Sequence, residues 1–143
     1  MTPLSDDTLR IGRAFANRTL PKSEWTHAAH LHAALWVLHE YGDDAFAVMP
    51  GLIRGYNEAT GTANTTTAGY HHTITLASLA AVRSCRDVFA SPWAERNWLL
   101  NCWSRERLFS TKARAEWVGP DLAPLPFPGP PTGTAPPGPP RVP

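Results

Sequence analysis

The chain has 143 residues, a length that fits one domain, and hydrophobic residues make up 43% of it, enough to form a core. Its net charge is +1 and only 17% of its residues are charged, so it lacks the basic character of proteins that bind nucleic acid or anionic membranes. The N-terminus is polar, and no apolar run approaches membrane-spanning length, so we expect neither a signal peptide nor a membrane span. Cys85 and Cys102 lack the spacing of a disulfide framework. We therefore expect a cytoplasmic protein.

Helical periodicity dominates the chain, and no segment shows the alternation typical of strands. The predicted helical segments, in chain order, are 5–17, 23–41, 43–60, 66–89, 92–108 and a short last one within 110–117. We expect Ser5 to cap the first, Ser23 the second, and Thr66 or Thr67 the fourth. Pro50 is expected to interrupt or kink the third. The sequence predicts a single-domain, all-α bundle of four to five helices.

Proline dominates the C-terminal part of the sequence. From Pro120 onward, eleven of the 24 residues are proline. We therefore expect the bundle to occupy residues 1–127 and residues 128–143 to form an extended, disordered, proline-rich tail. Such a tail is more often passive than a ligand for SH3-type domains, although an adaptor role is an alternative.

Histidines concentrate near the predicted starts of the second and fourth helices. His27 and His30 are three residues apart, so they share one side of a helix with apolar residues. His71 falls on the inward face of the fourth helix, whereas His72 falls to its side. Three imidazoles inside a helical bundle would form a mononuclear metal site, with a position left for water or substrate.

The residue types do not choose among Zn, Fe, Cu and Ni as the divalent transition metal. Two other interpretations stay open at this point. The histidines could be hydrogen-bonded core residues, or they could perform acid–base catalysis without a metal.

Other polar and aromatic residues could complete such a site. We expect one group to orient reacting groups around the metal: Tyr56, Asn57, Tyr70 and Thr75. A second group could bind substrate: Trp25 as a pocket wall, and Arg105 or Arg114 as a clamp for a carboxylate. A solvated helix face with ion pairs is the simpler interpretation of the two arginines.

Two resemblances add to these expectations. The motifs Trp25-Thr26-His27 with His30-Leu31, and Gly69-Tyr70-His71 with Thr73-Ile74-Thr75, resemble an uncharacterised bacterial family of small helical proteins over about residues 15–126. In that family the position of His72 is commonly glutamate, which implies that His72 could also be a metal ligand. The architecture is also similar to DinB/YfiT-type bundles, which hold a divalent metal with three histidines and include thiol-dependent transferases. Their late pair of histidines is missing, since no histidine follows His72.

These observations favour a metal-dependent enzyme, an oxygenase or a hydrolase, that acts on a small molecule and uses His27, His30, His71 and His72 as metal ligands. The alternatives are a non-catalytic metal-binding or structural module and a DinB-like thiol-dependent transferase. The expected partner is a small-molecule substrate rather than nucleic acid or a membrane, and the protein could act as a homodimer.

Overall fold

The computed structural model describes residues 4–131, and within that range it is all-α without any strand. The prediction of an all-α protein is confirmed. The α-helices are α1 (Asp6–Ala16), α2 (His27–Tyr41), α3 (Ala45–Ala59), α4 (His72–Ser84), α5 (Arg105–Leu108) and α6 (Thr111–Ala115). The 3-10 turns are η1 (Lys22–Glu24), η2 (Gly42–Asp44), η3 (Val88–Ala90), η4 (Pro92–Ala94) and η5 (Arg96–Asn101). None of the helices in the described range has the length and hydrophobicity needed to cross a membrane.

The expected helix count is not confirmed, because the predicted helix over 92–108 is divided into η4, η5 and the four-residue α5. The division before α5 has a clear cause. The Asp121 carboxylate accepts hydrogen bonds from the backbone N–H of Ser104 (2.7 Å) and from its hydroxyl (2.6 Å). Ser104 also accepts a hydrogen bond from Arg107 N–H and so caps a new helix instead of continuing the preceding turn.

The first two helices begin at polar caps. The Ser5 hydroxyl accepts a hydrogen bond from Thr8 N–H at 3.1 Å, so the predicted cap of α1 is confirmed. The predicted cap of α2 is wrong, because Ser23 lies inside η1. Thr26 caps α2 instead: its hydroxyl accepts a hydrogen bond from Ala29 N–H at 3.2 Å, and its backbone is extended.

The fourth helix is shorter than predicted at both ends, since residues 66–71 and 85–89 lie outside α4. Its cap is His71, not one of the two threonines: His71 Nδ1 accepts a hydrogen bond from Ile74 N–H at 3.1 Å. Gly69 has a φ of +81°, a left-handed conformation that an α-helix cannot contain. The helix therefore starts only after this glycine.

Asn64 holds the loop that leads from α3 into α4. Its side-chain oxygen accepts hydrogen bonds from Asn57 Nδ2 and from Tyr70 N–H, both at 3.0 Å. Its side-chain nitrogen donates to the Arg54 carbonyl at 3.2 Å. A Cβ at Gly69 would overlap the backbone of this loop, so the glycine lets the chain approach Asn64 closely.

The predicted interruption at Pro50 is not observed, because α3 continues through it from Ala45 to Ala59. Proline has no N–H to donate and costs one hydrogen bond inside a helix. Buried side chains on the same helix, including Phe46, Met49 and Ile53, hold it against the core despite that loss.

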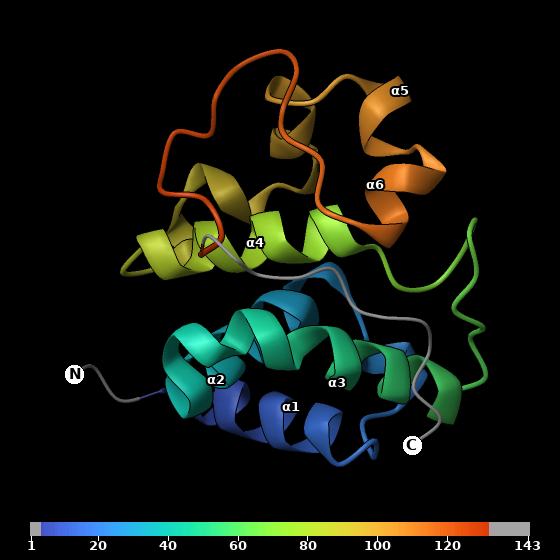
Figure 1. Ribbon diagram of the computed structural model, residues 1–143. Coiled ribbons are helices and arrows are strands. Elements are labelled where there is room, and N and C mark those ends of the chain that lie inside the picture. The colour runs from blue at the N-terminus through green and yellow to red at the C-terminus, as the bar shows by residue number, and fades with distance from the viewer. Residues whose placement is uncertain (1–3, 132–143) are drawn as a thin grey trace.

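The helices form two layers (Figure 1). One layer contains α1, α2 and α3; the other contains α4, the 3-10 turns that follow it, α5 and α6. Within the first layer, α1 and α2 pack closely because Gly12 leaves room for the Trp36 side chain, which a Cβ at that position would overlap. The core includes the fully buried rings of Phe15, Tyr56 and Trp103.

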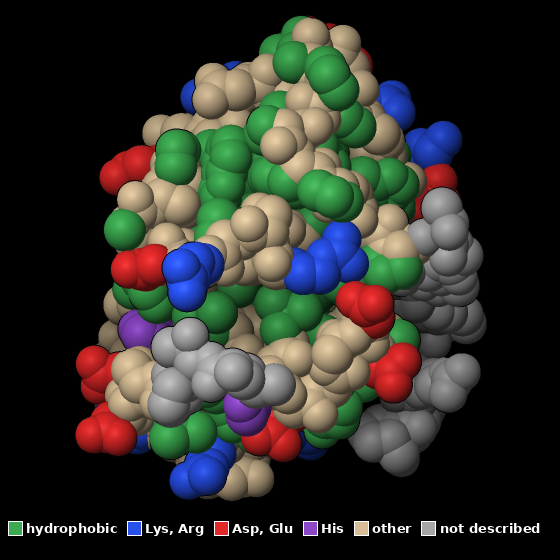
Figure 2. All heavy atoms as spheres, turned by 90° about the vertical axis from the view of Figure 1, so that its left-hand side faces the viewer, with side chains coloured by type: hydrophobic (Ala, Val, Ile, Leu, Met, Phe, Trp, Pro, Cys, Tyr) green, Lys and Arg blue, Asp and Glu red, His purple; other side chains and the backbone are tan. Residues whose placement is uncertain are grey.

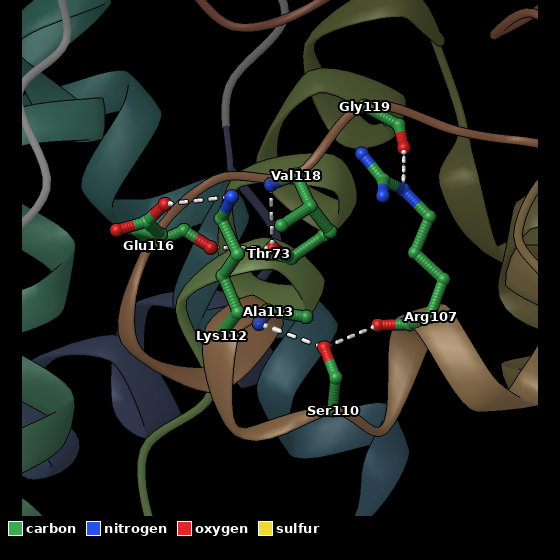
Figure 3. Close-up of polar contacts among 8 residues, drawn as sticks. All are labelled: Thr73, Arg107, Ser110, Lys112, Ala113, Glu116, Val118 and Gly119. Atoms are coloured by element: carbon green, nitrogen blue, oxygen red, sulfur yellow. Dashed lines mark hydrogen bonds and ion pairs between the residues drawn. The ribbon is translucent and has the colours of Figure 1, made fainter.

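Thr73, near the start of α4, binds the chain that follows α6 (Figure 3). Its hydroxyl donates to the Glu116 carbonyl at 2.8 Å and accepts from Val118 N–H at 3.1 Å. Arg107 Nε donates to the Gly119 carbonyl at 2.6 Å, one residue further on. These bonds fix the start of the segment that crosses the second layer.

That segment, residues 119–131, has no helix but packs against the 3-10 turns through an aromatic cluster. The Phe127 ring makes edge contacts with Trp93 (5.3 Å between centroids) and Trp98 (5.5 Å). Figure 2 shows hydrophobic side chains gathered over the upper half of one face, the half that contains these turns and this segment. The segment is thus part of the folded domain.

Arg83 of α4 holds the end of this segment. Its guanidinium donates to the Gly129 carbonyl at 2.7 Å and lies 4.8 Å from the centroid of the Phe46 ring. We expected the disordered tail to begin at Pro128, but the carbonyls of Pro128 and Gly129 are bound to α4 through Arg83. Residues 132–143, the rest of the predicted tail, are outside the described range.

Candidate functional site

A pocket of about 390 Å³ lies between the two layers. Its walls come from α2, α3 and α4. The chain beyond α4 closes it with η4, η5 and α5, which we together call the roof. Four lining residues are exposed to solvent and mark its rim: Arg96, Asn97, Arg105 and Phe109. The volume is within the range of pockets that bind small molecules.

The pocket is apolar in its body, where Leu31, Met49 and Ile53 line it, and its polar lining residues are either basic or neutral. His27, His30, Arg96 and Arg105 are lining residues, whereas no aspartate or glutamate among the described residues lines it. The predicted residues His27, His30, Thr75 and Arg105 are thus brought together around one space.

His27, the first residue of α2, is bound to the roof. Its Nε2–H donates to the carbonyl of Ala94 in η4 at 2.9 Å, because a carbonyl can only accept. A neutral imidazole carries one ring proton, so this bond leaves Nδ1 with a free lone pair. No hydrogen bond to His27 Nδ1 is present within the described residues.

His30 is fixed in the opposite tautomer. Its Nδ1–H donates to the Thr26 carbonyl, one turn earlier, at 2.7 Å, which leaves the Nε2 lone pair free. The ring packs on Trp25, with centroids 3.8 Å apart. Burial lowers the pKa of His30, the charges of His27 and Arg96 lower it further, and the bond to Thr26 opposes them. The ring is therefore neutral near pH 7.

His71 is buried, as predicted, but both of its ring nitrogens are engaged. Nδ1 caps α4, and Nε2–H donates to the carbonyl of Leu108 in α5 at 2.7 Å. To coordinate a metal, His71 would have to give up one of these bonds. Within the described residues, no group of three or more His, Cys, Asp or Glu side chains is placed to hold one metal ion.

His72 is completely buried, whereas the helical wheel predicted a side or outward orientation. The wheel failed because α4 is buried on more than one face: Leu76 and Leu79, which lie on the same side of the helix as His72, are buried as well. His72 Nδ1 and the Tyr70 hydroxyl are 2.6 Å apart and hydrogen-bonded. Its Nε2 has no hydrogen-bond partner among the described residues.

The remaining predicted residues have structural contacts. The Tyr56 hydroxyl donates to the Leu20 carbonyl at 2.9 Å, and Asn57 binds Asn64 in the loop before α4. Arg114 donates to the carbonyls of Gly69 and Tyr70, at 3.1 and 3.3 Å.

Trp25 is not a lining residue of the pocket, but it stacks on Phe15 and on His30, which does line it. The Thr75 hydroxyl lines the pocket and donates to the His71 carbonyl at 2.7 Å.

Arg96 and Ser78 line the pocket but were not predicted as site residues. Ser78 lies on the same helical face as Ile74 and Val82, so its inward position could be found from periodicity. No pattern in the sequence singles out Arg96, which lies in a 3-10 turn whose path depends on tertiary contacts.

Comparisons of the chain with protein-family models, with curated proteins and with solved structures give no match. The two resemblances drawn from the sequence motifs therefore stay predictions.

Burial of His72 makes stability depend on pH. Burial, with the nearby charges of Arg54 and His71, lowers the pKa of His72 to about 4 from the 6.5 of a free histidine. As pH falls, the unfolded chain takes up this proton first, so protonation favours unfolding. We expect His72 alone to account for a loss of about 2 kcal/mol in unfolding free energy between pH 7 and pH 4.5.

Urea denaturation at several pH values would measure this effect. The His72→Gln variant should show a shallower fall over the same interval, whereas the exposed control His39→Gln should follow the wild-type curve. Equal slopes for the wild type and His72→Gln would contradict the assignment.

Proposed function

We propose that the protein binds a small molecule with an apolar body and an anionic group in the pocket between its layers. The observation that carries this proposal is the composition of the lining: two arginines and two histidines, no acidic residue, and an otherwise largely apolar wall. An apolar pocket with a few convergent polar groups is the usual form of a small-molecule site.

The two arginines support an anionic ligand. Neither Arg96 nor Arg105 forms an ion pair with any carboxylate in the described part of the chain. Both are at the rim, where a guanidinium can bind a carboxylate through two parallel hydrogen bonds. The apolar side chains deeper in the pocket would cover the rest of the ligand.

The imidazole of His30 supports an enzymatic role for the site. It is neutral near pH 7, its Nε2 lone pair is free, and its orientation is fixed by the Thr26 carbonyl. A general base needs these three properties. In this proposal His30 removes a proton from the bound molecule while the arginines hold its anionic group.

Octanoate, a small apolar carboxylate, is a suitable probe of this site. Isothermal titration with the full chain should detect saturable binding, and Arg96→Ala and Arg105→Ala should each weaken it by about tenfold, because each removes a charged hydrogen-bond donor. Arg86→Ala, an exposed arginine outside the pocket, is the matched control and should leave the affinity unchanged. Absence of binding, or equal affinity in all variants, would contradict the proposal.

A metal-dependent enzyme, the function expected from the histidine motifs, is the second candidate. One observation favours it: His27 and His30 each donate one ring N–H to a backbone carbonyl and keep one free lone pair. Carbonyl partners of this kind orient metal-binding histidines in proteins. Here the pair would hold a divalent transition metal, and water or the ligand's own carboxylate would supply further ligands.

Metal content separates this candidate from the first. The full chain would be treated with a chelator, loaded with Zn²⁺ or Ni²⁺, dialysed and assayed for bound metal. If the pair binds metal, His27→Ala and His30→Ala should each lose it, and the exposed control His39→Ala should retain it. Retention of the metal by both pocket variants, or no metal in the wild type, would reject the candidate.

A further inference from the structure

Ser78 is a polar residue that lines the pocket from α4. It lies on α4 three residues after Thr75, about 4.5 Å further along the helix axis, and it is half-buried among lining residues that include Leu79 and Ala34. A hydroxyl in such surroundings needs a partner, because leaving it unpaired when water is displaced is costly.

The Ser78 hydroxyl has no hydrogen bond to any residue in the range 4–131. Serine and threonine inside helices commonly donate back to a carbonyl three or four residues earlier. Thr75 does so to His71, and Ser84, on the same helix, does so to Ala81 at 2.7 Å. Ser78 is thus a lining residue whose hydroxyl is not used by the backbone.

We propose that Ser78 is a specificity-determining residue, and that the ligand carries a hydroxyl or carbonyl group on its apolar body in addition to its anionic group. This inference rests on the proposed function, because it assumes that an anionic molecule occupies the pocket. A ligand without the second polar group would cover the Ser78 hydroxyl and leave it unpaired. A site with such a group discriminates against the ligand that lacks it.

The substrate class that follows is a small hydroxy- or oxo-carboxylic acid. The anionic group lies at the rim with Arg96 and Arg105, and the second polar group lies inside, at Ser78. The interior group distinguishes this class from simple fatty acids or aryl acids, whose polar contacts would be confined to the rim.

A set of matched probes tests the inference: octanoate and its monohydroxy isomers with the hydroxyl at each carbon from 3 to 8. Isothermal titration with the wild-type chain should find at least one isomer that binds about tenfold more tightly than octanoate. Ser78→Ala should abolish this preference while binding octanoate at least as tightly as the wild type. Alanine favours helix, so this variant should fold.

Ser84→Ala is the control, because it removes a hydroxyl from the same helix outside the pocket. It should keep the preference of the wild type. The inference is overturned if octanoate binds but no isomer binds more tightly, or if the preference survives in Ser78→Ala. If neither octanoate nor any isomer binds, the proposed function itself fails, and the inference fails with it.

Discussion

Hydrogen bonds from histidine rings to backbone carbonyls hold the roof of the pocket onto the helical layers. His27 binds the carbonyl of Ala94, 67 residues later in the chain, and His71 binds that of Leu108, 37 residues later. The roof consists of 3-10 turns and a four-residue helix, elements too short to be stable without tertiary contacts. The path of this part of the chain, and with it the pocket, therefore depends on tertiary contacts, and these two bonds link it to the starts of α2 and α4.

The same bonds determine which ring nitrogens of each histidine remain free to bind a ligand or a metal. His71 uses one nitrogen to cap α4 and the other to bind the roof, so it is a structural residue in this geometry. His27 and His30 use one nitrogen each and keep a lone pair beside a pocket that has arginines at its rim. This division between structural and available imidazoles underlies the ligand-binding proposal as well as the metal-binding alternative.

Much of the fold could be predicted because it depends on local patterns. The helical periodicity indicated the all-α class, Ser5 was identified as a cap, and the inward position of His71 was found from the spacing of apolar residues. The starts of α2 and α4 were misplaced because Thr26 and His71 compete successfully with nearby serine and threonine as caps. The predicted orientation of His72 was wrong because α4 is buried on more than one face, including the side that carries His72, Leu76 and Leu79.

The site could be predicted only in part, because its geometry depends on pairings across long distances in the sequence. The histidine pair and Arg105 were found from residue type and spacing. The engagement of His71 with Leu108 could not be found, because nothing local indicates which carbonyl lies opposite a ring. Arg96 and Ser78 can be recognised as pocket residues only when the position of the roof is known.

Nitrogen-15 NMR of the imidazole rings tests the central claim most directly, because ring nitrogen shifts distinguish the two neutral tautomers. At pH 7 the account predicts Nε2–H for His27 and His71 and Nδ1–H for His30, each identified by loss of its signal in the matching His→Gln variant. The opposite tautomer at His27 or His71 would mean that the carbonyl bonds to the roof are absent. That result would contradict the account of how the pocket is built.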